Sequence, residues 1–294
     1  MFEKMKAEFM FNLVLKRKNI DKAYKMVPPT DSWYNTISTV HASLDTIRKL
    51  PHQTLQITSH DGLNLQAVYY PNNSNKTMIW VHGYTSHAER ESAFSALFYR
   101  SLGFNVLIPY LRAHGPSEGK YISFGSLEPL DMGKWVDLIN EMHPDGSIVF
   151  HGLSMGGGVV LNMAATEMKN VKCLVADAPT MSICGSFRDM AGMVFKKSRD
   201  RVLPFLFERF QKEFGVNAED YDGARIVTNS IYPLLLSAGS NEHREEHFEQ
   251  LRQKNPQETS VVILEGCDHG NGMYKQTQVY QSAIKEFIGK HIGI

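Results

Sequence analysis

The sequence predicts an α/β fold built on a mostly parallel sheet of eight strands, with helices on both faces of the sheet. From residue 77 onward, short and almost continuously apolar runs alternate with longer segments of helical periodicity, as expected for parallel strands buried on both faces. Before them, two runs with a period of two flank the turn Asp61-Gly62, which predicts an antiparallel hairpin. With 294 residues, of which 43% are hydrophobic, the chain can bury such a core.

Residues 1–50 are expected to form an N-terminal helical extension outside the sheet. Asp31-Ser32 can cap a helix whose apolar side chains recur every three or four residues: Trp33, Ile37, Val40, Leu44 and Ile47. This apolar stripe needs a partner, either the core or the insertion at residues 180–232.

The core is expected from residues 51–179 and 233–294. The expected strands are 55–57, 63–69, 77–81, 104–109, 148–150, 171–176, 234–238 and 261–264. The expected helices are 89–102, 127–142, 159–168, 242–254 and 273–288.

Residues 180–232 break the alternation, because no strand of comparable quality is found there. The segment is rich in large apolar side chains: Phe187, Met190, Met193, Val194, Phe195, Leu203, Phe205, Leu206, Phe207, Phe210 and Phe214. Most of these suit ordinary packing between helices. Because the segment lies between two strands whose ends carry candidate site residues, we predict a helical lid over that edge of the sheet.

A nucleophile elbow is predicted at Gly152-Leu153-Ser154-Met155-Gly156. The Gly-x-Ser-x-Gly spacing falls between an apolar strand and a helix-forming segment. So sharp a turn needs residues without Cβ on both sides of the serine, and it holds the hydroxyl at the positive end of a helix. Ser154 is therefore the candidate nucleophile.

An activated serine needs a base within hydrogen-bond reach and an acid that orients the base, in the chain order serine, acid, histidine. Among the downstream histidines, only His269 lies in a loop directly after a strand. His291 is in the C-terminal tail, whereas His243 and His247 are expected on a helix. His269 is therefore the candidate base.

Glu242 leads the candidates for the acid, because it is the first carboxylate after the strand 234–238. Asp177, which closes the strand 171–176, is the runner-up. Asp268 adjoins His269, but its side chain is expected to diverge from the imidazole. An oxyanion hole needs two backbone N–H groups, for which we expect Met155 and Tyr84.

Together these motifs resemble the α/β-hydrolase family, and within it a bacterial group with prolyl-oligopeptidase-like or acyltransferase-like sequences. The resemblance covers residues 52–294 and is weakest across the insertion. It rests on His82-Gly83-Tyr84, on the segment 111–117, on the Ser154 elbow, on Val175-Ala176-Asp177-Ala178-Pro179 and on the His269 loop. It implies an α/β-hydrolase sheet with a serine nucleophile, and we expect neither a cofactor nor a metal.

The chain departs from this family at two places. Where members often have His-Gly-x-x-Asp, it has Ala238-Gly239-Ser240-Asn241-Glu242, so the carboxylate keeps its position and is one methylene longer. Where they usually have Asp-Arg-Gly-His-Gly, it has Leu111-Arg112-Ala113-His114-Gly115. The family tolerates the first change, and the second lies in a loop that is normally structural.

A different chemistry is suggested by His243-Arg244-Glu245-Glu246-His247, which fits the His-x-x-Glu-His pattern of inverted zinc proteases. An exposed, charged helix that follows the strand 234–238 accounts for the same residues, and we favour this interpretation. The 31 Lys and Arg balance the 31 Asp and Glu, so the overall charge points to neither nucleic acid nor an anionic membrane.

The N-terminal segment shows neither a signal peptide nor a spanning helix, since its longest apolar run, Phe9 to Leu15, is short and interrupted by Asn12. Three scattered cysteines, Cys173, Cys184 and Cys267, suit a reducing compartment. We therefore expect a cytoplasmic protein without membrane insertion.

The sequence thus predicts a serine hydrolase that cleaves an ester, thioester or small amide through an acyl-enzyme, with a small-molecule acyl substrate. The Phe- and Met-rich insertion favours an apolar acyl or aryl group. A peptidase or an acyltransferase with the same triad is a close alternative. A non-catalytic ligand-binding protein on this fold is disfavoured, because all three triad residues are present. The sequence leaves open whether the protein forms a homodimer.

Overall fold

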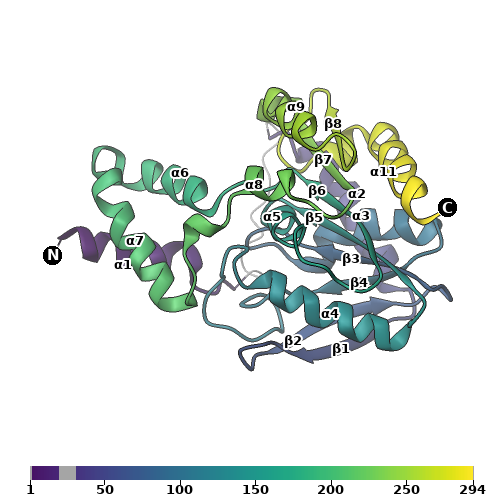
Figure 1. Ribbon diagram of the computed structural model, residues 1–294. Helices are drawn as coiled ribbons and strands as arrows, with labels where there is room; N and C mark the ends of the chain where they lie inside the picture. The colour runs from purple at the N-terminus through teal and green to yellow at the C-terminus, as the bar shows by residue number, and fades with distance from the viewer. Residues whose placement is uncertain (1, 20–30, 294) are drawn as a thin grey trace.

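The computed structural model describes residues 2–19 and 31–293 (Figure 1). The described strands are β1 (Gln53–Thr58), β2 (Asn64–Tyr70), β3 (Lys76–Val81), β4 (Asn105–Pro109), β5 (Ser147–Leu153), β6 (Val171–Asp177), β7 (Leu234–Gly239) and β8 (Thr259–Leu264). They form one sheet in the order β1-β2-β4-β3-β5-β6-β7-β8. β2 pairs antiparallel with β1 and β4, and the other neighbours are parallel. The predicted eight-stranded, mostly parallel sheet with a leading hairpin is confirmed.

The helices within the described residues are α1 (Phe2–Leu15), α2 (Ile37–Arg48), α3 (Ala88–Ser101), α4 (Glu128–Met142), α5 (Met155–Asn162), α6 (Ile183–Phe195), α7 (Arg199–Phe214), α8 (Gly223–Thr228), α9 (Glu245–Lys254), α10 (Gly272–Lys275) and α11 (Thr277–Ile292). Short 3-10 turns are η2 (Tyr34–Thr36), η3 (Lys196–Ser198), η4 (Ala218–Asp220) and η5 (Ser240–Glu242). None of the helices in residues 2–19 and 31–293 is both long and apolar enough to cross a bilayer.

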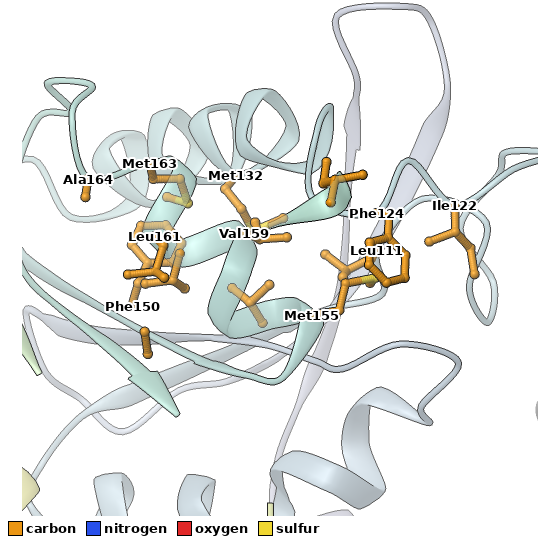
Figure 2. Packing of buried hydrophobic residues seen from close by; sticks show 14 of the residues in the cluster. Leu111, Ile122, Phe124, Met132, Phe150, Met155, Val159, Leu161, Met163 and Ala164 are labelled. Atoms are coloured by element: carbon orange, nitrogen blue, oxygen red, sulfur yellow. The ribbon is translucent and has the colours of Figure 1, made fainter. Parts of the chain in front are cut away.

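The core lies on both faces of the sheet, because successive side chains of each strand point to opposite faces. In β3, Ile79 and Val81 join the cluster that includes α4 and α5, whereas Met78 and Trp80 join the cluster formed with α2, α3 and α11. Figure 2 shows the first cluster, in which side chains of α4 and α5 pack above β5. The sheet is therefore a rigid platform covered on both sides.

Two predicted helices have different boundaries in the structure. The helix after the elbow begins at Met155 and ends at Asn162, not at residues 159–168. Its glycines pack against backbone, since a Cβ on Gly157 would lie 3.0 Å from the carbonyl oxygen of Asp177. The helix predicted at 242–254 begins only at Glu245, because residues 240–242 form a 3-10 turn and His243 has a φ of 54°.

The helices at the two ends of the chain also differ from the prediction. Asp31 does accept a hydrogen bond from the N–H of Trp33, but a 3-10 turn follows and α2 begins only at Ile37. The last predicted helix is interrupted at Gln276, where α10 ends and α11 begins. Residues 20–30 of the predicted extension lie outside the described residues.

The N-terminal helices lie in two separate places. α2 packs on α3, on the side of the sheet that carries α11. α1 instead runs beside α7, and α6 and α7 extend away from the sheet together with it (Figure 1). Residues 180–232, all of them described, hold α6, α7 and α8 and no strand. The insertion thus projects from the edge at which β6 ends.

Candidate active site

Ser154 occupies a strained turn between β5 and α5. Its φ of 58° and ψ of −116° lie in a region that residues with a side chain rarely adopt. The turn is possible because its neighbours lack Cβ: a Cβ on Gly152 would overlap the carbonyl of Gly156, and one on Gly156 would overlap the carbonyl of Val81. Ser154 N–H donates to the carbonyl of Asp177 at 2.8 Å, which fixes the turn to β6.

Ser154, His269 and Glu242 meet at the carboxyl edge of the sheet. His269 Nε2 lies 2.9 Å from Ser154 Oγ, and His269 Nδ1 lies 2.7 Å from Glu242 Oε2. The acid and the histidine come from the loops after β7 and β8, which pair in parallel and so open at the same edge. The structure therefore joins the three residues in the order that the sequence predicts.

The surroundings of Glu242 favour its ionised form beside the imidazole. Burial by itself would raise the pKa of Glu242, but the hydrogen bond and charge of His269, with Arg244, hold it below the usual value. Its Oε1 also accepts the N–H of Gly239 at 3.1 Å. The Glu242 side chain is 8% exposed and that of His269 is 52% exposed, so the acid is sheltered while the imidazole faces the open side.

The two other candidate acids have different partners. Asp177 is buried, and its oxygens accept from Ser237 Oγ and from the Tyr280 hydroxyl, each at 2.8 Å. Burial raises the pKa of Asp177 to about 6. Asp268 accepts from Asn241 Nδ2 at 2.9 Å and from Asn271 Nδ2 at 3.3 Å, whereas His269 Nδ1 is bonded to Glu242.

The residues expected to stabilise an oxyanion flank Ser154. Met155 is the first residue of α5, where backbone N–H groups have no partner within the helix. Gly83 lies against the serine, since a Cβ there would be 3.4 Å from Ser154 Cβ, and Tyr84 follows it. The Tyr84 hydroxyl donates to the carbonyl of Val14 in α1 at 2.5 Å. The N-terminal helix thus supports the loop that carries this N–H group.

Sequence reasoning missed Glu91, which anchors the same loop. Its Oε1 accepts from Gly83 N–H at 2.9 Å and from Trp80 Nε1 at 3.2 Å. Burial raises the pKa of Glu91 to about 7. The available signal was weak: a carboxylate that adjoins the small, buried side chains of α3, such as Ala88 and Ser92.

The Arg112 loop is held by ion pairs. Arg112 donates to Asp131 at 2.7 Å and to Asp61 at 2.9 Å. His60, Asp61 and Asp131 come within 4.8 Å of one another, the spacing of possible metal ligands. The guanidinium already supplies a positive charge between the two carboxylates, so these residues are a poor fit for a metal ion.

Residues 243–247 also lack the backbone geometry of an inverted zinc-protease motif. That pattern requires two histidines on one face of a helix. His243 has left-handed backbone and precedes α9, whereas His247 lies within it.

An aromatic row leads from the loop that carries Tyr84 into the insertion. The Tyr84 ring centroid lies 5.5 Å from that of Phe124, which lies 5.6 Å from that of Phe187 in α6. Phe187 in turn stacks on Phe207 of α7 at 6.5 Å. The insertion is therefore joined to the site by apolar contacts.

The family described as "Serine aminopeptidase, S33" matches residues 72–221, which is about half of the chain. The chain belongs to this family of α/β hydrolases. The matched segment of the hydrolase holds Ser154 and ends before Glu242 and His269. In Bacillus subtilis (strain 168), the "Uncharacterized protein YqkD" is 24% identical over 253 residues, covering 84% of this hydrolase and 83% of that protein.

Solved structures share the fold. An esterase of Pyrococcus furiosus is 26% identical to this hydrolase, with a TM-score of 0.65 and coverage of 92% of this chain and 100% of the other. Est1E of Butyrivibrio proteoclasticus, solved with ferulic acid bound, is 19% identical, with a TM-score of 0.61 and coverage of 82% and 100%. The second likeness shows the fold alone.

Proposed function

We propose that the protein is a serine hydrolase of the carboxylesterase type, which cleaves an ester, thioester or small amide with an apolar acyl or aryl group. One observation carries the proposal: the continuous contact from Ser154 Oγ through His269 to Glu242, at 2.9 and 2.7 Å. Membership of a hydrolase family and the likeness to the Pyrococcus furiosus esterase support it.

In the proposed mechanism, Ser154 Oγ attacks the substrate carbonyl while His269 Nε2 accepts the hydroxyl proton. Glu242 holds the imidazole through Nδ1 and stabilises the imidazolium as it forms. The N–H groups of Met155 and Tyr84 stabilise the oxyanion. His269 then gives the proton to the leaving group, and water, activated by the same imidazole, hydrolyses the acyl-enzyme.

The insertion α6–α8 serves as a lid that binds the acyl or aryl part. Phe207 is the half-buried member of the aromatic row and offers apolar surface, while the buried Phe187 and Phe124 connect it to the loop that carries Tyr84. The same acyl-enzyme would also serve an acyltransferase, in which an alcohol replaces water. Product analysis with an added alcohol separates the two. We place the enzyme in the cytoplasm, because its three cysteines, all within the described residues, are unpaired.

The test is covalent labelling with a fluorophosphonate, together with turnover of a p-nitrophenyl ester. Ser154→Ala should lose labelling and reduce turnover by about 10⁴-fold or more while the protein stays folded, because the glycines rather than the hydroxyl permit the turn. Ser101→Ala, at the exposed end of α3, is the matched control. Full labelling of Ser154→Ala would refute the proposed nucleophile.

A further inference from the structure

Helix α1 is apolar on two opposite faces, and only one of them is covered. The covered face packs beside α7 and contains Ala7, Met10, Phe11, Val14 and Leu15. The other face carries Phe2, Met5, Phe9 and Leu13, which are 63%, 64%, 57% and 45% exposed. Their spacing of three or four residues places them in one stripe. A helix that is apolar all round is normally buried on all sides, so the stripe calls for a partner.

The end of α6, near the start of α1, carries two more exposed apolar side chains. Lys6 Nζ donates to Ser198 Oγ at 3.0 Å, which fixes the start of α1 beside η3. Met193 and Val194, just before η3, are 75% and 44% exposed. Six of the ten large hydrophobic side chains exposed in the described part of the chain therefore belong to α1 and this junction. We call these six the α1–η3 patch; such clustering marks interaction surfaces.

Positive charge gathers around the same patch. Residues 2–19 and 183–201 together contain ten Lys and Arg against four Asp and Glu, which is a net charge of +6. The whole chain has a formal net charge of zero, so the remainder carries −6. A second copy that docked through this face would bring two such segments together, and their like charges would repel. An anionic surface is electrostatically complementary to it.

We propose that the α1–η3 patch docks the protein on the surface of an anionic lipid bilayer. An apolar helix face rimmed by Lys and Arg lies in the membrane plane, with its apolar side chains at the boundary of headgroups and acyl chains. Anionic headgroups attract the basic rim. With 14 residues, α1 is too short to span a bilayer, which requires about 20.

Docking in this way has a consequence that rests on the proposed function. The exposed stripe ends at Leu13, and the carbonyl of the next residue, Val14, accepts from the Tyr84 hydroxyl. Val14 lies on the covered face of α1, so one helix diameter, ~10 Å, separates the bilayer surface from the loop that flanks Ser154, and esters dissolved in the membrane are presented at that distance from the lid.

The test is co-sedimentation of the full chain with vesicles of phosphatidylcholine, with and without an equal part of phosphatidylglycerol. Binding should rise at least about tenfold with the anionic lipid and fall with added salt, which screens exposed charges. The combined change Phe2→Ser, Met5→Ser and Phe9→Ser should abolish binding. Leu130→Ser with Val279→Ser is the matched control, because these side chains are 52% and 50% exposed on α4 and α11.

Absence of vesicle binding, or equal binding of the triple variant and the control, would overturn the proposal. A concentration-dependent dimer that the triple variant loses would assign the patch to a second copy and would equally overturn it. Turnover of a short, water-soluble ester should be the same in the triple variant and the wild type. If the fluorophosphonate failed to label Ser154 in the wild type, the proposed function would be refuted, but the vesicle-binding result would still test the docking proposal.

Discussion

At the scale of single residues, the partly buried Glu242 and the buried Asp177 are two carboxylates with separate partners. Glu242 lies 2.7 Å from His269 Nδ1, whereas Asp177 bonds Ser237 and Tyr280. Glu242→Gln should reduce kcat by about 10⁴-fold with little change in folding, because the amide favours the wrong tautomer of the imidazole. Asp177→Asn should keep near-wild-type turnover.

Steady-state kinetics on a p-nitrophenyl ester, with circular dichroism as the folding control, measures both variants. Reversed phenotypes would transfer the role of the acid to Asp177 and refute the proposed triad.

The residues of the candidate triad could be predicted because their signals are local. Ser154 lies in a five-residue motif, and Glu242 and His269 each follow a recognisable strand. Glu91 could not be predicted in the same way, since its effect depends on a contact with Gly83 across two elements. The hydrogen bond from the Tyr84 hydroxyl to the carbonyl of Val14 could not be predicted either, because every residue has a carbonyl and the sequence does not single this one out.

At the scale of elements, the aromatic row makes the proposed lid testable. Phe207 is half-buried and stacks on Phe187. Each buried methylene of a substrate contributes up to ~0.8 kcal/mol, so longer acyl chains should be preferred until the pocket ends. Phe207→Asp should therefore reduce kcat/KM for longer p-nitrophenyl esters more than for the acetate.

The matched control is Gln211→Asp, which places the same charge at an exposed position of α7. A uniform loss over all chain lengths would mean that Phe207 does not contact the acyl chain.

The succession of strands and helices along the chain was predictable from alternating patterns, but the boundaries of the helices were less so. The start of α5 was predicted too late because three consecutive glycines, residues 156–158, precede Val159 and intrinsic propensity disfavours glycine in helices. The close approach of α5 to β6 and the following loop overrides that preference. The delayed start of α9 likewise follows from tertiary contact, since Glu242 turns back to the N–H of Gly239 and to His269.

At the scale of the whole molecule, a buried polar network joins the neighbouring strands β5 and β6 to α11 and α3, which cover one face of the sheet. Asp177 of β6 accepts from Tyr280 of α11, whose hydroxyl lies 2.9 Å from His151 Nε2 of β5. His151 Nδ1 lies 3.2 Å from the Tyr99 hydroxyl of α3. Burial lowers the pKa of His151 to about 3, so its imidazole is neutral over the ordinary pH range.

The raised pKa of Asp177, about 6 against an unperturbed 3.8, makes stability depend on pH. The folded state keeps the proton longer than the unfolded state, so this contribution is full below about pH 4 and is lost as the pH rises through about 6. The free energy of unfolding of the wild type, relative to Asp177→Asn, should fall by about 1 kcal/mol per pH unit in that window.

Urea unfolding at several pH values measures this difference, and the His151 contribution is common to both proteins. A difference that rose with pH would mean that the folded state favours the carboxylate instead.

The order of strands also sets the order in which the site becomes complete during synthesis. The nucleophile precedes His269 by 115 residues, and β7 and β8 join the sheet last, at its edge. A ribosome adds about 5–20 residues per second, so the serine is made on the order of 10 s before the histidine. A nascent chain can fold its elbow while it lacks a base. If the protein has the proposed function, the nascent chain therefore stays unreactive toward cellular esters until the final strand and its loop are in place.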